Sequence, residues 1–221
     1  LLFACGLVAL AALAARLGWP ILADPTSGLR SAPNAVTAFD SLLRHAGFAT
    51  AQVPDVVVRV GRPPASKVLA QWIVGAGVPV VQVGGPGPID PDHNVAAWAT
   101  LADLEHLTGA PDGDWSASWQ AADTAAEAVF DALVSRGEVS EPAVARTVAA
   151  ALPAGTGLFV SSSMPIRDLE WFGGPAARAG SNRGANGIDG VMATALGAAL
   201  TGRPTAVLIG DIAFLHDSNA L

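Results

Sequence analysis

The stretch that decides the fold of this chain is Thr205-Ala206-Val207-Leu208-Ile209-Gly210-Asp211. Its apolar run ends in a glycine and then an aspartate, which is typical of a buried strand in a parallel sheet. The carboxyl edge of such a sheet is where α/β folds bind anionic ligands and metal ions. Asp211 is therefore the best single candidate for a metal ligand, because carboxylate oxygens suit Mg²⁺. The competing interpretation is an aspartate that only caps the following helix.

A glycine-punctuated loop lies upstream of this strand and reads Ser181-Asn182-Arg183-Gly184-Ala185-Asn186-Gly187-Ile188-Asp189-Gly190. Loops of this kind open helices and let backbone N–H groups approach phosphates closely. A helix rich in alanine and glycine is expected to follow through Leu200, with Asp189 as its cap. The loop and the strand together predict a site for an anionic ligand.

Arg167 and Arg183 each lie in a loop that follows an expected strand or opens a helix. A planar guanidinium binds a carboxylate through two parallel hydrogen bonds, so this pair can hold a substrate with several carboxylates. Ser163, just past the expected strand over residues 158–160, can donate a hydrogen bond to the same substrate. The Gly-x-Ser-x-Gly frame of a hydrolase nucleophile is absent around it. Ion pairing of both arginines with neighbouring carboxylates is an equally good interpretation.

Short apolar strands alternate with helices along the chain, which predicts an α/β fold with parallel sheets covered on both faces. Two α/β units are expected, a Rossmann-like unit over residues 1–110 and the beginning of a second unit over residues 111–221. A Gly/Pro/Asp-rich stretch between them reads as a linker. The expected strands are 1–4, 19–23, 55–60, 79–83, 158–160 and 205–209, and the expected helices are 8–17, 35–43, 67–74, 118–135, 140–152 and 189–200.

The composition allows a sizeable core and argues against several classes of protein. Hydrophobic residues make up 51% of the 221 residues and charged residues 14%, which argues against disorder. The net charge of −7 and the scattered lysines and arginines argue against a nucleic-acid surface. The single cysteine, Cys5, excludes an intrachain disulfide and suits a reducing cytoplasm. Residues 1–17 are interpreted as part of the fold rather than as a membrane helix, with a signal peptide as the minority alternative.

Three motifs occur in order along the chain: Ser163-Met164-Pro165-Ile166-Arg167-Asp168, the loop 181–190, and Gly210-Asp211-Ile212-Ala213-Phe214-Leu215-His216-Asp217. Together they resemble one family of thiamine-diphosphate enzymes, the 2-succinyl-5-enolpyruvyl-6-hydroxy-3-cyclohexene-1-carboxylate synthases of menaquinone biosynthesis. The Gly-Asp element is general to thiamine-diphosphate enzymes, whereas the two arginine motifs are specific to this family. Further stretches are similar to the family's middle domain, namely Gly18-Trp19-Pro20, Asp24-Pro25-Thr26-Ser27-Gly28, Gly61-Arg62-Pro63-Pro64 and Ser66-Lys67.

The resemblance implies a transferase that forms a carbon–carbon bond. In the implied reaction 2-oxoglutarate is decarboxylated, CO₂ is released, and the succinyl unit is added to isochorismate. The implied cofactor is thiamine diphosphate, held through Mg²⁺ or Mn²⁺. On this basis Asp211 is a metal ligand, and the residues expected to contact the cofactor are Gly187, Ile188, Gly210, Asp211 and Ile212.

Both implied substrates carry two carboxylates, which gives Arg167, Arg183 and Ser163 a common role in binding them. Lys67 adds a positive charge from the middle domain. The resemblance further implies a cytoplasmic homodimer or homotetramer without membrane insertion. The family's activating glutamate and the asparagine that completes its metal site are expected outside this chain. The chain is therefore expected to be an internal fragment, without a catalytic residue of its own and inactive alone.

The chain departs from the family's pattern at two places. Ser161-Ser162 stands where Gly-Asn is expected, and Ala213 stands where a hydroxyl residue is expected; neither concerns the roles above. Two alternatives remain open. One is another thiamine-diphosphate enzyme, of the acetohydroxyacid synthase or 2-oxoacid decarboxylase type, although monocarboxylate substrates have less use for two arginines. The other is a non-catalytic α/β binding module that keeps only the architecture.

Overall fold

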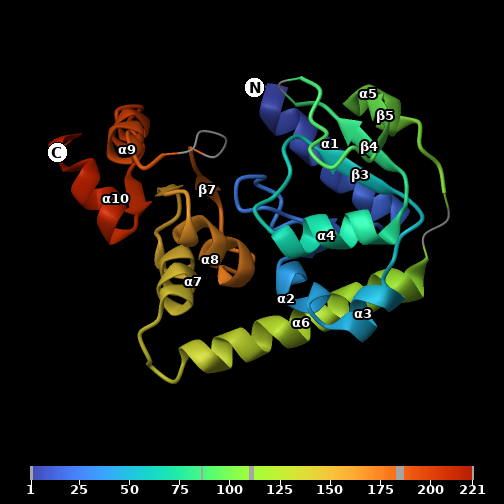
Figure 1. The fold of residues 1–221 in the computed structure, drawn as a ribbon, viewed down its shortest axis with the longest axis horizontal. Coiled ribbons are helices and arrows are strands. Elements are labelled where there is room, and N and C mark those ends of the chain that lie inside the picture. The colour runs from blue at the N-terminus through green and yellow to red at the C-terminus, as the bar shows by residue number, and fades with distance from the viewer. Residues whose placement is uncertain (1, 86, 110–111, 183–186, 221) are drawn as a thin grey trace. The chain divides into compact units, whose positions relative to one another are not determined.

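The computed structural model describes residues 2–85, 87–109, 112–182 and 187–220. Contacts divide the chain into two compact units, the first with residues 1–22 and 32–126 and the second with residues 23–31 and 127–221. Each unit contains a three-stranded parallel sheet, and a helix lies between most strands that follow one another in the chain (Figure 1). The expected α/β class with parallel sheets is therefore confirmed.

The first unit holds a sheet in the order β3-β4-β5 and a separate parallel pair, β1-β2. Leucines of α1 and α5 pack with Val83 of β4 in one core cluster. A second core gathers around Trp119 of α6, whose indole meets three aromatic rings edge-on. The elements are α1 (Leu2–Leu17), β1 (Ile21–Leu22), β2 (Ala35–Val36), α2 (Phe39–Leu43), α3 (Ala46–Ala51), β3 (Val57–Val60), α4 (Lys67–Ala76), β4 (Val80–Val83), β5 (Val95–Ala99), α5 (Leu101–Glu105) and α6 (Gly113–Val134), which continues into the second unit.

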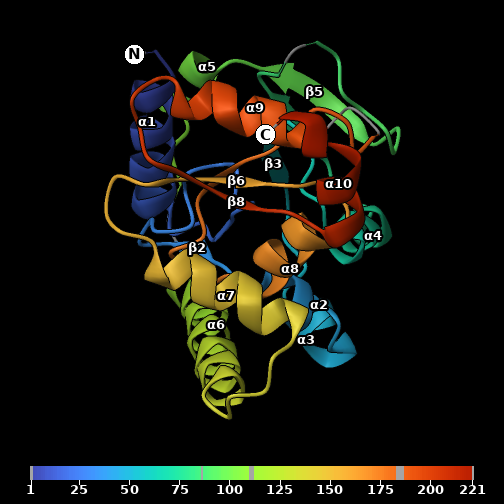
Figure 2. The ribbon, with the colours of Figure 1, turned by 90° about the vertical axis from the view of Figure 1, so that its left-hand side faces the viewer.

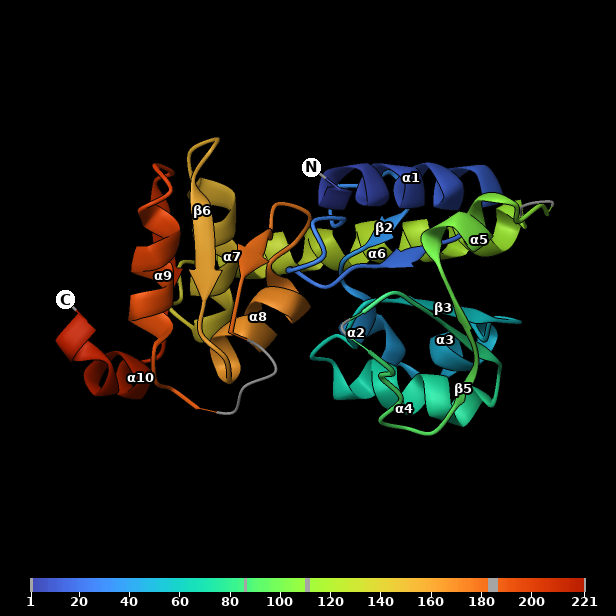
Figure 3. The same cartoon turned by 90° about the horizontal axis from the view of Figure 1, so that it is seen from above.

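The second unit places helices on both faces of a sheet in the order β7-β6-β8. Successive side chains of a strand point to opposite faces. Leu158 and Val160 of β6 accordingly pack with α7 and α8, and Phe159 packs with α9 (Figure 3). The elements are α7 (Glu141–Ala151), β6 (Gly157–Val160), α8 (Met164–Phe172), β7 (Ala179–Gly180), α9 (Val191–Ala199), β8 (Thr205–Leu208), α10 (Asp211–His216) and the 3₁₀ helix η1 (Ser218–Ala220).

Two helices begin where the sequence predicts, because a serine hydroxyl caps each of them. The Ser66 hydroxyl accepts a hydrogen bond from the N–H of Leu69 at 2.9 Å at the start of α4. The Ser140 hydroxyl accepts one from the N–H of Ala143 at 3.4 Å at the start of α7, where Pro142 occupies the first turn. Both capping residues satisfy N–H groups that have no partner inside the helix.

Two sequence-based expectations about the first unit are wrong. Residues 2–17 form the continuous helix α1 instead of a strand over residues 1–4 followed by a separate helix over residues 8–17. Leucine and alanine are strong helix formers, and one interior glycine costs only about 1 kcal/mol. The predicted helix over residues 35–43 is the short strand β2 followed by α2, because Ala35 and Val36 pair with β1. Residue 1 lies outside the described residues.

The border between the two compact units lies between residues 126 and 127, inside α6. Compact units of contact need not coincide with the domains of a family, so the domain border predicted between residues 110 and 111 stays a prediction. In the part of the chain that the structure describes, every helix is too short or too polar to span a bilayer.

Candidate functional site

The carboxyl ends of the strands of the second unit meet at one edge of the sheet. β6 and β8 are parallel neighbours with Val160 opposite Leu208, and the N–H of Ser161 donates to the Leu208 carbonyl at 2.9 Å (Figure 2). β7 pairs with the other side of β6, with Phe159 opposite Gly180. The chain therefore runs from β6 to β7 on one side and then returns to β8 on the other. Such a reversal of strand order is where open α/β sheets bind ligands.

All three sequence motifs leave the sheet at this edge. Ser163 follows β6, Asp211 follows β8, and Ser181 and Asn182 follow β7. The loop that begins at Ser181 leads to Arg183, which lies outside the described residues together with residues 184–186. The topology thus brings the Ser163 and Asp211 segments to a common edge, and the role of Arg183 stays a prediction.

Ser163 has a strained backbone in the turn between β6 and α8. Its φ of 76° and ψ of −135° lie in a region that residues with a Cβ avoid, at a cost of roughly 1–2 kcal/mol. A strained residue between a strand and a helix is also the backbone arrangement of a nucleophile elbow. The backbone arrangement of such an elbow therefore occurs here although the Gly-x-Ser-x-Gly pattern is absent. Its consequence is an exposed hydroxyl that forms no hydrogen bond with any described residue.

Arg167 lies on α8 four residues after Ser163, which precedes the helix as its N-cap. Its side chain is exposed and, within the described residues, forms no ion pair with Asp168, Glu170 or Asp189. Asp168 and Glu170 of the same helix are buried. Surface ion pairing therefore does not account for Arg167, which supports the interpretation as a ligand-binding residue.

Asp211 begins α10 directly after Gly210. One carboxylate oxygen accepts a hydrogen bond from the N–H of Ile212 at 2.8 Å, and the exposed side chain makes no contact of this kind with other described residues. Mg²⁺ needs only one or two protein carboxylates when phosphate oxygens complete its shell. No cluster of three His, Cys, Asp or Glu side chains suited to a metal occurs among the described residues. The role of Asp211 as a metal ligand stays a prediction.

Asp217 holds the start of α9. Its buried carboxylate accepts hydrogen bonds from the N–H groups of Gly190 at 3.1 Å, Met192 at 2.6 Å and Ala193 at 3.4 Å. Burial by itself raises the pKa of Asp217, but these three donors outweigh it, so the net effect is a lowered pKa. The predicted cap, Asp189, is wrong, because the capping carboxylate comes from a distant part of the sequence. No local sequence pattern predicts a helix cap that comes from a residue more than 20 positions away.

The loop before α9 is also tied to α10 by a second contact. Asp189 has an exposed carboxylate, 3.1 Å from Nδ1 of His216. His216, at the end of α10, and Asp217, its C-cap, thus both contact the segment that leads into α9. These contacts give His216 and Asp217 structural roles. Gly187 and Ile188 lie in this loop, and Ile212, 64% exposed, lies at the start of α10. The residues predicted to contact a cofactor therefore sit on two segments that are fastened to each other.

Lys67 belongs to the first unit and is described with it. It is the first residue of α4, is exposed, and forms no ion pair with the described residues. The preceding Ser66 fixes the helix start, since its hydroxyl also donates to the carboxylate of Asp40 at 2.5 Å. The side chain of Lys67 is thus available to a ligand, and its predicted role stays a prediction.

Comparison with known proteins gives two findings. Residues 5–160 match the family model described as "Middle domain of thiamine pyrophosphate". Proteins named 2-succinyl-5-enolpyruvyl-6-hydroxy-3-cyclohexene-1-carboxylate synthase from Myxococcus xanthus and Thermobifida fusca are 44% and 42% identical, over 96% and 97% of this chain. The one from Rubrobacter xylanophilus is 40% identical over 96% of this chain. The matches cover 38–40% of these relatives, so the chain spans about two fifths of their length. The expected resemblance to these synthases is confirmed.

Proposed function

Because the chain belongs to the middle-domain family of thiamine pyrophosphate enzymes, we propose that the protein containing it is a synthase of the kind its relatives are named for. The proposed reaction removes CO₂ from 2-oxoglutarate and joins the succinyl unit to isochorismate, in menaquinone biosynthesis. The observation that carries the proposal is the edge shared by Ser163, Arg167 and Asp211. The side chains of these three residues form no hydrogen bond or ion pair with the side chains of other described residues.

Asp211 would hold the Mg²⁺ or Mn²⁺ ion that accompanies the cofactor, through the carboxylate oxygen that its own helix leaves free. Gly210 gives room for close approach at the strand end, since no atom lies within 4 Å of the position of an added Cβ. Gly187, Ile188 and Ile212 would contact the cofactor from the two fastened segments. When bound, thiamine diphosphate supplies the electron sink for decarboxylation, and the chain supplies anchoring and orientation.

The substrates of the proposed reaction are dicarboxylates, and the second unit offers cations to match them. Arg167 would present a planar guanidinium at the same end of α8 as the Ser163 hydroxyl, and a carboxylate would accept hydrogen bonds from both. Arg183, from the loop after β7, is assigned to a second carboxylate, and Lys67 of the first unit to a further one. Binding at fixed cations orients a substrate before any bond changes, which is where the rate advantage of positioning arises.

The substrate assignment is tested by Arg167→Ala in the full-length protein, with KM measured separately for 2-oxoglutarate and isochorismate. We expect the KM of one substrate to rise at least tenfold, which corresponds to about 1.4 kcal/mol of lost binding. Arg178→Ala is the matched control, because Arg178 is an exposed arginine that precedes β7 at the opposite, amino edge of the sheet. Unchanged KM values for both substrates in Arg167→Ala would contradict the assignment of Arg167 to substrate binding.

The metal assignment is tested by Asp211→Asn, with the Mg²⁺ concentration for half-maximal activity as readout. An amide oxygen is a weaker ligand for a hard cation than a carboxylate, so this concentration should rise at least tenfold, on the order of 1.4 kcal/mol. Glu138→Gln removes one exposed carboxylate from a loop away from the edge and should leave it unchanged. Equal Mg²⁺ dependence of wild type and Asp211→Asn would contradict the role of Asp211.

We also propose that the protein acts in the cytoplasm as a homodimer or homotetramer. Support comes from α9, its C-cap and α10, where Leu196, Leu200 and Leu215 are 44%, 87% and 68% exposed. The two helices contact each other, and exposed large apolar side chains are typical of surfaces that another part of an assembly covers. Light scattering coupled to size-exclusion chromatography measures the oligomeric state, and a monomer at micromolar concentration would contradict it.

A further inference from the structure

The outward side of α6 is apolar along most of its length. α6 is one unbroken helix of 22 residues (Figure 1), and residues three or four positions apart lie on the same side of a helix. Val129 and Leu133 on this side are 55% and 49% exposed, and the alanines beside them are exposed as well. We call this surface the α6 face, and it consists of Ala117, Ala121, Ala125, Ala128, Val129, Ala132 and Leu133.

The charged side chains of α6 beyond its first turn are engaged elsewhere. Asp123 accepts a hydrogen bond from the N–H of Thr37 at 2.8 Å. The carboxylates of Glu127 and Asp131 each lie 2.7 Å from the guanidinium of Arg146. The side of a helix that faces water normally carries charged and polar residues. Because the α6 face is exposed and carries no charge, we expect another element to cover it.

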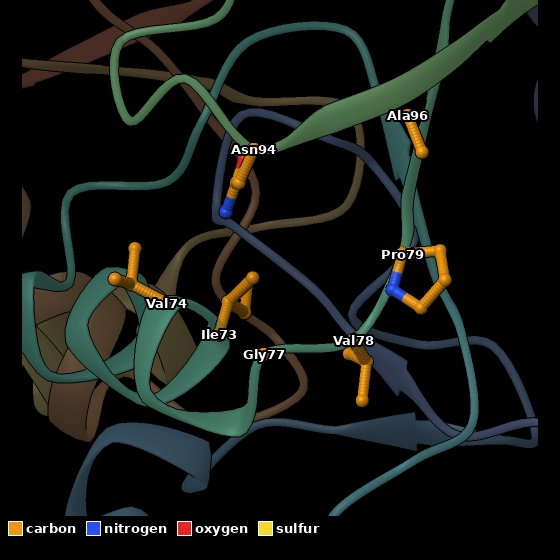
Figure 4. A pocket seen from close by; sticks show the side chains of 7 residues that line it. All are labelled: Ile73, Val74, Gly77, Val78, Pro79, Asn94 and Ala96. Carbon is orange, nitrogen blue, oxygen red and sulfur yellow. The ribbon is translucent and has the colours of Figure 1, made fainter.

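The α6 face differs from apolar residues that are exposed singly. Val74 of α4, for example, is 49% exposed and borders an open depression of the surface at the amino ends of β4 and β5. Figure 4 shows that the polar side chain of Asn94 interrupts the apolar lining of this depression. Scattered apolar side chains are normal on a protein surface and need no partner. The residues of the α6 face, in contrast, follow one another along one side of one helix.

The size of the side chains on the α6 face changes along the helix. Val129 and Leu133 lie toward its carboxyl end, whereas only alanines lie toward its amino end. A second α6 that runs antiparallel can set Val129 over the partner subunit's Ala121 and Leu133 over the partner subunit's Ala117. Large residues then fill the space that small ones leave, as close packing requires. A parallel pair would set large against large and alanine against alanine.

The ends of α6 carry opposite charges. Asp114 lies in its first turn and Arg136 just after its last turn, and both are exposed. Neither side chain forms an ion pair with a described residue. Ala125 stands midway between them in the sequence. An antiparallel pair with Ala125 on its two-fold axis therefore brings each Asp114 to the partner subunit's Arg136, so charge favours the same alignment as size.

We propose that α6 pairs with α6 of a second copy of this chain, antiparallel and with Ala125 on the two-fold axis. A two-fold interface uses the same surface of both subunits, so that surface must complement itself, as the α6 face does. Alanines near the axis let the helices approach to the short end of the usual range of about 8–10 Å between helix axes. The pairing rests on the proposed assembly of copies and on none of the proposed chemistry, and it uses none of the exposed leucines of α9 and α10.

The test is disulfide formation at the two-fold axis in the full-length protein, with Cys5 and any other native cysteine replaced by alanine. Ala125→Cys should link two subunits under mild oxidation, because residues on the axis come within the roughly 4.4–6.8 Å that a disulfide allows between Cα atoms. Ala132→Cys is the matched control on the same face. It lies seven residues from the axis, so its counterpart in an antiparallel pair is about 21 Å away, and no disulfide should form.

An exchange of charges tests the alignment independently. In the Ala125→Cys protein, Asp114→Arg places like charges together at both ends of the pair. The protein concentration that gives half cross-linking in a fixed short time should then rise at least tenfold. Adding Arg136→Asp restores opposite charges and should return this concentration to its value in Ala125→Cys alone. A role of Asp114 within its own subunit would not be rescued by the second change.

The cross-linking result separates this pairing from the proposed oligomer. Absence of a disulfide in Ala125→Cys, in a protein that light scattering shows to be an oligomer, overturns the pairing of α6 and leaves the proposed oligomer intact. A monomeric protein contradicts both. Equal cross-linking of Ala125→Cys and Ala132→Cys overturns the antiparallel geometry.

A last variant distinguishes a second copy from another segment of the same polypeptide. Ala125 is exposed, so Ala125→Arg should separate the subunits at α6 and leave the circular dichroism of the folded chain unchanged. Ala150→Arg, at an exposed alanine of α7, is the control and should leave the assembly as it is. If Ala125→Arg instead made the chain less stable and kept the number of subunits, the α6 face would be covered by a segment of its own polypeptide, which overturns the proposal.

Discussion

The carboxylate of Asp217 accepts a hydrogen bond from the N–H of Met192 at 2.6 Å, across 25 residues of sequence. It thereby fastens the end of α10 to the start of α9, and α10 begins with Asp211. The loop before α9 and the proposed metal ligand are therefore parts of one hydrogen-bonded assembly. A change at Asp217 is expected to act on both.

We predict that Asp217→Ala lowers the melting temperature by roughly 3 °C, since the variant loses the cap of α9. The Mg²⁺ concentration for half-maximal activity should rise as well, because the two segments are no longer fastened. Circular dichroism at 222 nm measures the melting, and Asp217→Asn is the matched control, because an amide oxygen still caps a helix. An unchanged melting temperature in Asp217→Ala would contradict the capping role.

The stabilising effect of Asp217 should also depend on pH. The pKa of Asp217 is lowered in the folded chain, so the unfolded chain binds this proton more readily. The stabilisation is then complete above the usual aspartate pKa of about 3.9 and is lost as the pH falls through the lower folded value. The stabilities of wild type and Asp217→Asn should therefore converge in acid. Denaturant unfolding at several pH values measures this, and a difference that stays constant down to about pH 2, well below that pKa, would refute it.

Ser163 offers a pair of substitutions that separates backbone strain from chemistry. Ser163→Gly and Ser163→Ala both remove the hydroxyl, but only glycine relieves the φ of 76°. We expect Ser163→Gly to be more stable than Ser163→Ala by about 1 kcal/mol, after the entropic cost of glycine. Both variants should raise the KM of the same substrate. Urea unfolding and steady-state kinetics measure the two effects, and equal stability of the two variants would mean that the turn stores no strain.

The sequence predicts those elements whose signals are local. Ser66 and Ser140 mark helix starts, because their own hydroxyls cap the helices. The β-branched runs at 57–60 and 80–83 lie within predicted strands and form strands in the structure. Tertiary pairing decides the rest. Residues 95–99 contain three alanines and form β5 only because β4 offers a partner, while Ala35 and Val36 follow β1 rather than their helical pattern.

The candidate site divides in the same way. Residue types and their positions after strands predict that Ser163, Arg167 and Asp211 belong to the carboxyl edge of the sheet, because parallel strands share that edge. The positive φ of Ser163 leaves no mark in the sequence, since serine is not the residue that such a turn favours. The sequence does not predict the cap supplied by Asp217 either, because the packing of α10 against α9 decides which N–H groups its carboxylate meets.

Asp168 should destabilise the folded chain at neutral pH. Burial, and secondarily repulsion from Glu141, raise the pKa of Asp168 to about 6. The folded chain then binds this proton more tightly than the unfolded chain, so stability is highest below about pH 4 and falls as the pH rises to about 6. Asp168→Asn should be more stable than the wild type at pH 7 by about 1–2 kcal/mol, once solvent screening is allowed for. Urea unfolding between pH 4 and pH 7 measures both effects.

Glu141→Gln provides the control for Asp168. Glu141 is exposed, so its substitution removes the repulsion and leaves the burial of Asp168 intact. Glu141→Gln should therefore only partly reduce the pH dependence of stability that the Asp168 carboxylate causes. Asp168→Asn should abolish that pH dependence. If Asp168→Asn were less stable than the wild type at pH 7, the carboxylate would have a stabilising role that its surroundings do not indicate.

Arg146 of α7 joins α6 to the end of α8. Its buried guanidinium lies 2.7 Å from carboxylate oxygens of both Glu127 and Asp131 and donates to the Phe172 carbonyl at 2.7 Å. Burial by itself lowers the pKa of Arg146, but the hydrogen bonds that the guanidinium donates to both carboxylates outweigh it, and the pKa is raised. Arg146→Met should cost about 3 kcal/mol, because it strands a partly buried carboxylate and a carbonyl. Asp131→Asn should cost less than 1 kcal/mol, because the Asp131 side chain is 70% exposed. Urea unfolding compares the two, and equal losses would mean that the exposed carboxylate, rather than the buried contacts, carries the interaction.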